Sequence, residues 1–381
     1  MRKIAVITGT RAEYGLFKPV LKAMESHGNL QASLIVIGMH LSPEFGYTVE
    51  EIEKDGFKIG AKIAALHAED TKASMANSLG KCLSKIVEAM EKMRPDILLV
   101  LGDRSEMLVG AIAATYLGIP IAHIHGGEVS GNVDEPVRHA ITKLAHIHFP
   151  ATKESAKRII KMGEEPWRVH VVGAPGLDSI LNETIPDPKE TAAKYGLSIS
   201  KPVLLVLQHS VVAEAEDAAN QMRETLEAVK ELKQRTVIIY PNADAGGRRM
   251  IKIIRQYEEY PFVKSFRSVP HEDYLGLMKL ATVMIGNSSS GIIEAPSFGL
   301  PVVNIGTRQI GRQRAGNVVD VGYDRKDIIS AVKKALCDVG FIERVKHCKN
   351  PYGDGKAGKR IARFLAEVTL GSKLLEKRMT Y

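Results

Sequence analysis

Short runs of Val, Ile and Leu recur along this chain, and segments with helical periodicity separate them. The runs occupy residues 4–7, 33–37, 97–101 and 119–124 in the first half, and 203–207, 236–240, 283–285 and 302–304 in the second. Continuous apolar runs of this kind are typical of parallel strands that are buried on both faces. Because helical segments connect the runs, the pattern predicts an α/β protein built from doubly wound sheets.

The strand–helix pattern occurs twice, and a stretch rich in Pro and Asp at residues 184–188 separates the two series. A chain of 381 residues also exceeds the size at which one hydrophobic core usually suffices. We therefore predict two Rossmann-like domains that face a cleft, residues 1–172 and 186–355, with a C-terminal helix at 356–381 that returns to the first domain. Ligands bind open α/β sheets at the carboxyl ends of the strands, so we expect the functional residues around this cleft.

The chain carries a surplus of positive charge, with 52 Lys and Arg against 44 Asp and Glu. Such a surplus raises the question of a polyanionic partner. Most of it lies from Phe341 onward, where ten Lys and Arg stand against four Asp and Glu. Ile361, Phe364, Leu365 and Val368 have the spacing of one helix face there, and basic residues lie on the other. Aromatic residues do not alternate with the basic ones, so we predict a docking helix with a solvated basic face and no nucleic-acid partner.

The number and spacing of the cysteines, together with the hydropathy of the chain, indicate the cellular compartment. Cys82, Cys337 and Cys348 form no C-x-x-C pair, which suits a reducing compartment and provides no zinc ribbon. The apolar run after Met1 is too short for the core of a secretory signal. No window reaches the roughly eighteen consecutive apolar residues of a membrane span. We therefore predict a cytoplasmic protein that does not contact a membrane.

The first apolar run leads into Thr-Gly-Thr-Arg-Ala-Glu-Tyr-Gly at residues 8–15, which has the order strand, glycine turn and helix start. Backbone N–H groups and the helix dipole favour an anion at such a turn, and Arg11 adds a bidentate donor. Alternatively, Gly9 serves only to make a tight turn. The segment lacks the G-x-G-x-x-G pattern, so it does not indicate a nicotinamide cofactor.

Carboxylates gather after the next two strands of the first half. Asp103 and Arg104 follow one strand, His-Ile-His-Gly-Gly-Glu ends at Glu128 after the other, and Asp134 and Glu135 come next. Neighbouring carboxylates separate one another's pKa values and suit general acid and base catalysis. We expect Glu128, after two glycines, to lie on exposed backbone that faces the cleft. Asp103 and Asp134 are also consistent with simple helix caps.

A His-x-His pair, His123 and His125, lies in the same segment. Alternation along a strand places both side chains on one face, where two imidazoles can bind a metal. Neither a cysteine nor another histidine stands at a spacing that completes a ligand set. We therefore predict no metal and no other cofactor.

The strands of the second half end in small polar residues. The most specific segment is Ser288, Ser289, Ser290 and Gly291, which follows the run at 283–285 and opens a helix. Backbone N–H groups and hydroxyls in this geometry bind a diphosphate. A plain Ser/Gly loop without a ligand is the alternative.

Further candidates follow the same strand ends. Glu294 stands one turn into the predicted helix, where it can accept both hydroxyls of a ribose. His209 and Asn242 follow the runs at 203–207 and 236–240, and a later Gly-Thr-Arg segment supplies two guanidinium groups as phosphate clamps, Arg308 and Arg312. Three strand ends in one half thus predict a nucleotide site.

Together, these motifs resemble the hydrolysing UDP-N-acetylglucosamine 2-epimerases. The likeness spans nearly the whole chain and is carried by residues 8–15, 102–104, 123–128, 134–143, 286–291 and 306–312. The non-hydrolysing epimerases have Glu-Ala-Gly-Leu-Arg where this chain has His125-Gly-Gly-Glu128, which favours the hydrolysing branch. The resemblance implies a glycosyltransferase-B architecture, with UDP held mainly by the second domain and the sugar against the first.

The resemblance also implies a reaction. UDP leaves carbon 1 as the proton leaves carbon 2, water adds to the glycal-type intermediate, and carbon 2 is reprotonated on the opposite face. The product is free N-acetylmannosamine, a precursor of sialic-type acids, and family members assemble as homodimers or homotetramers. The alternatives are the same chemistry on UDP-2,4-diacetamido-2,4,6-trideoxy-glucose, a UDP-sugar glycosyltransferase, and a nucleotide-sugar sensor without catalysis.

Roles for the candidate residues follow as hypotheses. Glu128 removes the carbon-2 proton, Asp103 and Asp134 serve the returning proton and the water, and His209 acts at the diphosphate. The groups that neutralise the diphosphate are His209, Arg11, Arg104, Arg308 and the three serines, while Glu294 holds the ribose and Asn242 lies beside the sugar or nucleotide. The remaining substrate-binding candidates are Gly15, Glu135, Arg138, His139, Gly291 and Arg312.

Overall fold

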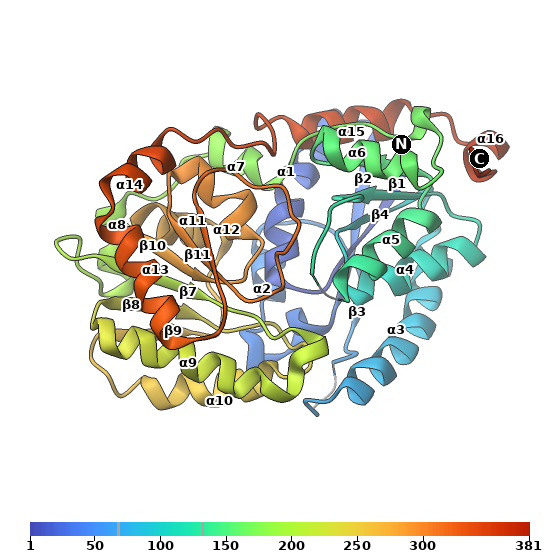
Figure 1. Cartoon of the computed structure of the whole chain (residues 1–381). Coiled ribbons are helices and arrows are strands. Elements are labelled where there is room, and N and C mark those ends of the chain that lie inside the picture. The colour runs from blue at the N-terminus through green and yellow to red at the C-terminus, as the bar shows by residue number, and fades with distance from the viewer. Residues whose placement is uncertain (67–68, 132) are drawn as a thin grey trace.

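The computed structural model describes residues 1–66, 69–131 and 133–381 and contains two six-stranded parallel sheets (Figure 1). The strand order in the first sheet is β3-β2-β1-β4-β5-β6. Its strands are β1 (Arg2–Thr8), β2 (Leu30–Ile37), β3 (Ile59–Ile63), β4 (Ile97–Leu101), β5 (Ile121–Ile124) and β6 (Ile147–Phe149). The direction of the strand order reverses between β1 and β4, which pair in parallel from Ile4 and Ile97.

The second sheet has the order β12-β11-β10-β7-β8-β9, which reverses between β10 and β7. Its strands are β7 (Val203–Leu207), β8 (Arg235–Ile239), β9 (Val263–Phe266), β10 (Val283–Gly286), β11 (Val302–Ile305) and β12 (Val318–Val321). Central strands of both sheets are buried throughout. The predicted fold class, two doubly wound α/β sheets, is confirmed. Ligand sites of such sheets lie where the strand order reverses, at the carboxyl ends of the strands.

Helices cover both faces of the first sheet (Figure 1). They are α1 (Arg11–His27), α2 (Val49–Lys54), α3 (Lys72–Met93), α4 (Ser105–Tyr116), α5 (Asp134–Leu144), α6 (Lys153–Lys161) and α7 (Gly176–Asn182), with 3₁₀ turns η1 (Gly38–Leu41), η2 (Pro43–Phe45) and η3 (Pro166–Arg168). Thr10 and Glu13 form a capping box that starts α1 immediately after β1. The strand predicted at 119–124 begins later, because the Ile119 N–H bonds to the Ala114 carbonyl and closes the turn after α4.

The second sheet has its own helices. They are α8 (Pro188–Tyr195), α9 (Ala218–Leu232), α10 (Gly247–Tyr257), α11 (His271–Leu280), α12 (Ser290–Ile293), α13 (Arg325–Cys337) and α14 (Val339–Lys346), with η4 (Val212–Asp217) and η5 (Ala295–Phe298). The helix predicted to open at Gly291 is only the short α12. Pro296 has no N–H to continue the helical ladder, so the chain changes to the 3₁₀ turn η5.

The C-terminal segment returns to the first half, where α15 (Ala357–Glu367) packs against α1 (Figure 1). Ile361 and Leu365 are buried in the same cluster as strand residues of β1. The single helix predicted for 356–381 is wrong, because α15 ends at Glu367 and the short α16 (Ser372–Leu375) follows. Val368 leaves the helical conformation (ψ 131°) after α15, and extended Gly371 (φ 171°, ψ −176°) stands immediately before α16.

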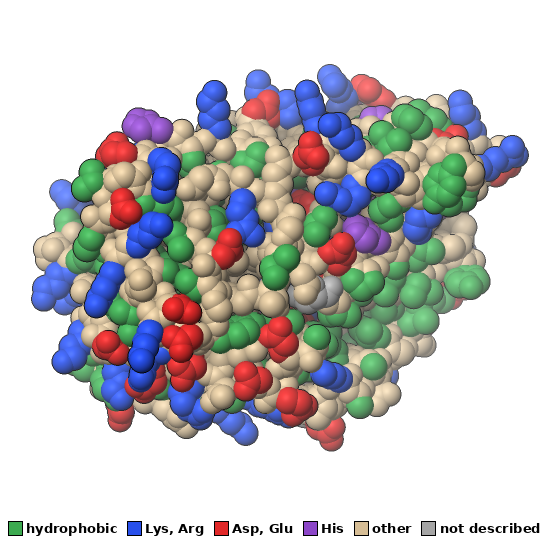
Figure 2. All heavy atoms as spheres, viewed as in Figure 1, with side chains coloured by type: hydrophobic (Ala, Val, Ile, Leu, Met, Phe, Trp, Pro, Cys, Tyr) green, Lys and Arg blue, Asp and Glu red, His purple; other side chains and the backbone are tan. Residues whose placement is uncertain are grey.

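The basic face of α15 is exposed, as predicted. Lys359 and Arg363 are exposed, opposite the buried apolar face. Figure 2 shows lysines and arginines along the upper edge of this view, where α15 lies. Among the described residues, no helix combines the length and the hydropathy that a membrane span needs.

Candidate active site

Two neighbouring cavities lie at the carboxyl ends of both sheets. The first, which we call the serine cavity, includes Ser288, Ser289, Ser290 and Glu294 and has an empty volume of about 760 Å³ with its solvent-open part. The second, the carboxylate cavity, includes Asp103, Asp134 and Arg138 and measures about 810 Å³ in the same way. Thr10, His209 and Asn242 line both. The sizes suit small-molecule ligands, and both halves of the chain contribute to each wall.

The serine cavity has a floor of hydroxyl groups. Ser290 Oγ lies 2.5 Å from the hydroxyl oxygen of Tyr274 and 2.9 Å from Ser288 Oγ, so its position is fixed by two partners. Across from it, the Arg11 guanidinium lies 5.3 Å from the centre of the Tyr274 ring. A cation at the start of α1 therefore faces a loop of hydroxyls after β10, an arrangement that suits a phosphate group.

Glu294 is a buried acid in the same cavity. Burial raises the pKa of its carboxyl group to about 7, although Arg11 and His125 favour the ionised form. Its Oε1 atom is buried and has no hydrogen-bond partner within the described structure. A buried acceptor of this kind requires a donor to be satisfied, and ligand hydroxyls are suitable donors.

His209 stands where the two cavities join. Its Nδ1 accepts the Asn242 N–H at 3.2 Å, so the loops after β7 and β8 hold the ring in place. Burial, with the neighbouring Arg308, lowers the pKa of His209 to about 3. The imidazole is therefore neutral at pH 7 and supplies a hydrogen bond rather than the positive charge that we expected it to bring to a diphosphate.

In the carboxylate cavity, Arg138 organises three segments of the first half. Its guanidinium forms an ion pair with Asp103 and donates to the Glu128 carbonyl at 2.9 Å and to Ser130 Oγ at 3.3 Å. Arg138 is 1% exposed, so these bonds form in a protected environment. The predicted substrate ligand Arg138 thus fixes the position of the Asp103 carboxylate at the cavity wall.

Asp134 connects the two halves at the other side of this cavity. It is the first residue of α5, and its Oδ2 lies 3.3 Å from Arg308 Nη2 of the second half. Arg308 also donates to the Asn287 carbonyl at 3.2 Å. The N-cap position of α5 is occupied by Val133, so Asp134 stands in the first turn of the helix.

Glu128 does not face the cavity as predicted. Its side chain is 2% exposed, and its two oxygens contact His125 Nδ1 and Arg312 Nη2, each at 2.5 Å. Burial favours the neutral acid, but Arg312 and His125 outweigh it and lower the pKa of Glu128 to about 2. The expectation of an exposed Glu128 failed because the loop after β5 turns inward. At Gly127 (φ 73°), a side chain would collide with the Ser155 carbonyl.

A family model described as UDP-N-acetylglucosamine 2-epimerase matches residues 22–366, which include most of the cavity residues but not those at the start of α1. The chain belongs to this family. Membership makes it an enzyme of the UDP-sugar 2-epimerase class, so the resemblance seen in the motifs is confirmed.

Two relatives and one solved structure each match 90% or more of this chain. UDP-N,N'-diacetylbacillosamine 2-epimerase (hydrolyzing) of Legionella pneumophila is 40% identical over 381 residues and 100% of both chains. UDP-N-acetylglucosamine 2-epimerase of Neisseria meningitidis is 34% identical over 90% of this chain and 89% of the relative. The solved structure of UDP-GlcNAc 2-epimerase from Methanocaldococcus jannaschii, in complex with UDP-GlcNAc and UDP, has a TM-score of 0.78 at 21% identity and covers 95% and 99% of the two chains. This last likeness shows the two-domain glycosyltransferase-B fold.

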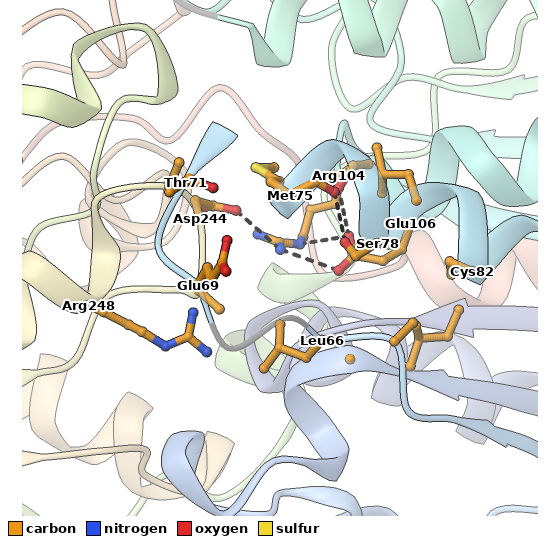
Figure 3. A pocket seen from close by; sticks show the side chains of 17 residues that line it. Leu66, Glu69, Thr71, Met75, Ser78, Cys82, Arg104, Glu106, Asp244 and Arg248 are labelled. Carbon is orange, nitrogen blue, oxygen red and sulfur yellow. Dashed lines mark hydrogen bonds and ion pairs between the residues drawn. The ribbon is translucent and has the colours of Figure 1, made fainter. Parts of the chain in front are cut away.

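In this family member, Arg104 is not placed like a simple phosphate ligand. Its Nε lies 3.4 Å from Glu13 and 3.3 Å from Glu106, and its Nη2 lies 3.3 Å from Asp244. Figure 3 shows the guanidinium between Glu106 and Asp244, and Arg104 lines both a smaller adjoining pocket and the carboxylate cavity. Three carboxylates offset its charge, so Arg104 contributes to holding the two halves together.

Four other predicted ligands lie away from the cavity surfaces. Gly15 lies on α1 where a side chain would overlap the His271 ring, so it permits close approach of the two halves. Glu135 accepts the Ser130 N–H at 3.0 Å and pairs with His139 at 3.5 Å, which fixes the loop before α5. A side chain at Gly291 would meet Val302 of β11 at 3.0 Å, so this glycine serves packing.

Sequence reasoning missed several cavity residues. Glu13, Tyr274 and Gln309 line the cavities. Glu13 lies within the motif at residues 8–15, but its spacing was that of an ordinary capping residue. Tyr274 has the spacing of a core residue on α11. Within the described part of the chain, no group of three or more His, Cys, Asp or Glu side chains is arranged to hold a metal ion.

Proposed function

We propose that this protein is a hydrolysing 2-epimerase that converts a UDP-2-acetamido sugar to UDP and the free 2-epimeric sugar. The observation that carries the proposal is the meeting of the two cavities. Carboxylates of the first half line one cavity, and the serine loop of the second half lines the other and reaches the first through Ser288 and Ser289. His209 and Asn242 also belong to both. A nucleotide sugar has a matching division into a diphosphate with its nucleoside and a reacting sugar.

In this proposal UDP occupies the serine cavity, held mainly by residues 186–355. Ser288, Ser289, Ser290 and Arg11 bind the diphosphate, and the unpartnered Glu294 oxygen accepts ribose hydroxyls. Neutral His209 donates a hydrogen bond at the junction. The sugar then extends into the carboxylate cavity, against residues 1–172. Support for this placement comes from the order of the lining residues. Arg11 and Glu294 line the serine cavity, His209 lines both cavities, and the first-half carboxylates line the carboxylate cavity.

The reaction requires a base for carbon 2, an acid for its opposite face and a site for water. Asp103 and Asp134 line the carboxylate cavity at different positions, one after β4 and one at the start of α5. Two acids approaching the sugar from different loops suit the return of a proton to the opposite face of carbon 2 and the positioning of the water. Arg308, which lines the same cavity, stabilises the negative charge of the departing diphosphate.

We favour the UDP-linked 2,4-diacetamido-2,4,6-trideoxy sugar, diacetylbacillosamine, as substrate. Support comes from the Legionella relative, which matches at 40% identity over the whole chain. Leu16, Leu101 and Ile293 also line the carboxylate cavity, and apolar side chains suit a sugar whose carbon 6 is a methyl group. UDP-N-acetylglucosamine is the second candidate, supported by the Neisseria relative at 34% identity.

The test is incubation of the protein with each UDP-sugar in the absence of any acceptor, followed by NMR of the sugar that is released. We expect UDP and a free 2-epimeric sugar, with higher kcat/KM for the diacetamido substrate. An intact donor in both reactions would contradict the proposed function and favour a glycosyltransferase or a sensor. Higher kcat/KM for UDP-N-acetylglucosamine would reverse the choice of substrate and keep the reaction.

A further inference from the structure

Arg312, Glu128 and His125 form a row at the wall of the carboxylate cavity, in which Arg312 and His125 line the cavity and Glu128 lies between them. Arg312 Nη2 contacts Glu128 Oε2, and Glu128 Oε1 contacts His125 Nδ1, each at 2.5 Å. Arg312 is also held by Gln309 Oε1 at 3.0 Å. Both oxygens of Glu128 are therefore occupied, one by each neighbour.

Only one end of the Glu128–His125 pair reaches the cavity. His125 lines the carboxylate cavity and Glu128 does not. The other ring nitrogen of His125, Nε2, is buried and has no hydrogen-bond partner within the described structure. Nearly all buried polar atoms of folded proteins have partners, so an orphaned ring nitrogen at a cavity wall indicates a ligand contact.

The backbone at His125 gives independent support. Its φ angle is +61°, in the left-handed region that non-glycine residues adopt infrequently and that His, Asn and Asp adopt more often than other types. This conformation at the end of β5 sets the direction in which the His125 side chain leaves the backbone. The conformation turns the chain out of β5, and the His125 N–H remains bonded to the Phe149 carbonyl at 3.1 Å.

We propose that His125 is the group that takes the carbon-2 proton, and that Glu128 and Arg312 are positioning residues that act through it. This inference rests on the proposed function and names a residue of the same site. Ionised Glu128 can only accept, so it fixes the His125 proton on Nδ1 and leaves the Nε2 lone pair toward the cavity. As in the catalytic triads of hydrolases, a carboxylate holds the imidazole in one tautomer and orientation, and Arg312 keeps this carboxylate ionised.

Two observations make Glu128 itself a poor base. Both of its carboxylate oxygens are engaged by His125 and Arg312, and Glu128 does not line the carboxylate cavity, so a sugar carbon does not reach it without rearrangement. The Arg312 charge, together with the hydrogen bonds from Arg312 and His125, opposes the effect of burial and lowers the pKa of Glu128. A carboxylate with so low a pKa takes a proton from carbon weakly, whereas an imidazole is suited to this exchange near neutral pH.

The proton transfer is balanced as follows. The bond between carbon 2 and its hydrogen breaks, the proton moves to His125 Nε2, and the electron pair forms the double bond between carbons 1 and 2. The bond from carbon 1 to the diphosphate oxygen breaks at the same time, and UDP leaves with that pair. Water later gives its hydroxyl to carbon 1 and its proton to the opposite face of carbon 2. The proton on His125 passes to solvent, and it is the proton that the overall hydrolysis releases.

The test compares His125→Gln, His125→Ala and Glu128→Gln with the wild type, using UDP release for turnover and calorimetry with UDP for binding. We expect His125→Gln to lose roughly a thousandfold or more in kcat, as removal of a proton-transfer group does, with UDP affinity within about threefold. We expect Glu128→Gln to lose less, about a hundredfold, mainly in kcat rather than KM. Added imidazole should restore part of the activity of His125→Ala, because the vacated cavity wall admits the free base.

The controls separate this inference from the proposed function. His347→Ala removes a surface histidine and should retain wild-type turnover with and without imidazole. Turnover of His125→Gln within tenfold of wild type would overturn the inference, as would absence of imidazole rescue in a His125→Ala protein that binds UDP. If His125→Ala does not fold, His125→Gln alone decides. A wild-type protein that releases no UDP from either sugar would instead contradict the proposed function.

Discussion

The two sheets have the same topology, but the residues at their functional edges differ in kind. The loops of the first sheet present titratable groups, including Asp103, His125 and Asp134. The loops of the second sheet present hydroxyls and amides, including Ser288 and Asn242, together with two arginines. The fold provides two equivalent edges, and the residues immediately after the strands decide that one edge suits proton transfer and the other suits anion binding.

The two edges are also connected by charge. Arg308 and Arg312 of the second edge pair with Asp134 and Glu128 of the first. Interactions of this kind are weakly screened because the groups are largely buried. The predictions below test whether the edges divide chemistry and binding between them, from the largest expected effect to the smallest.

Removal of an acid from the first edge should affect turnover far more than binding. We expect Asp134→Asn to lower kcat roughly a thousandfold, since general acid–base groups commonly contribute about 10²–10⁴-fold. UDP affinity, measured by calorimetry, should change by less than about threefold. The control Asp320→Asn removes a carboxylate that pairs with Arg314, away from the cavities. A large loss of UDP affinity in Asp134→Asn would show that the first edge also binds the nucleotide.

Removal of a cation from the second edge should affect UDP binding more than turnover. We expect Arg308→Gln to weaken UDP binding by roughly ten- to a hundredfold, because a charge-assisted contact to phosphate is lost. The control is Arg314→Gln in the same loop, whose partner Asp320 is exposed. Equal UDP affinities in the two variants would remove Arg308 from the diphosphate site.

Two glycine substitutions test the contact between the edges. Gly15→Ala introduces a side chain into the space of the His271 ring, and such overpacking costs typically about 1–3 kcal/mol. Gly80→Ala, within helix α3, meets nothing within 4 Å and should stabilise the protein by about 0.5–1 kcal/mol. Urea denaturation measures both. Stabilisation by Gly15→Ala would show that the halves are not closely packed there.

Glu294 provides a pH-dependent test of the second edge. Burial raises its pKa to about 7, against Arg11 and His125, so the carboxyl group is largely protonated at pH 6 and ionised at pH 8. Because the ionised form accepts ribose hydroxyls, UDP affinity should rise with pH by up to about tenfold across this interval. The measurement is the difference between wild type and Glu294→Gln, which cancels titration of UDP itself. Parallel pH profiles of the two proteins would contradict the ribose assignment.

Much of the fold follows from local sequence. The strands at 97–101 and 203–207 were predicted at their observed bounds, because uninterrupted Val and Leu runs leave no other buried conformation. Helix ends were less well predicted. Pro296 reduced α12 to a short helix, and α15 ends at Glu367 because Val368 leaves the helical conformation (ψ 131°). Single residues that break a hydrogen-bond ladder override the periodicity around them.

The candidate site was predicted as a set of strand-end motifs, but not as a set of contacts. Asp103, Asp134 and Arg308 lie at the carboxylate cavity, as their positions after strands indicated. Glu128 lies behind the wall, while His125, which was considered only as a metal ligand, lies on it. Both residues belong to one short segment, so spacing alone does not tell which side chain reaches the ligand.

The sequence by itself determined the two doubly wound sheets, the polar character of each strand end and the family, because these depend on hydrophobic period and on short motifs. The tertiary structure decided which charges pair and which groups are neutral. Arg312 and Glu128 stand 184 positions apart in the chain, yet their side chains are 2.5 Å apart. His209 is neutral because burial and Arg308 lower its pKa. Ion-pair energies and pKa shifts depend on the distance between groups and on their burial, and neither is a property of local sequence.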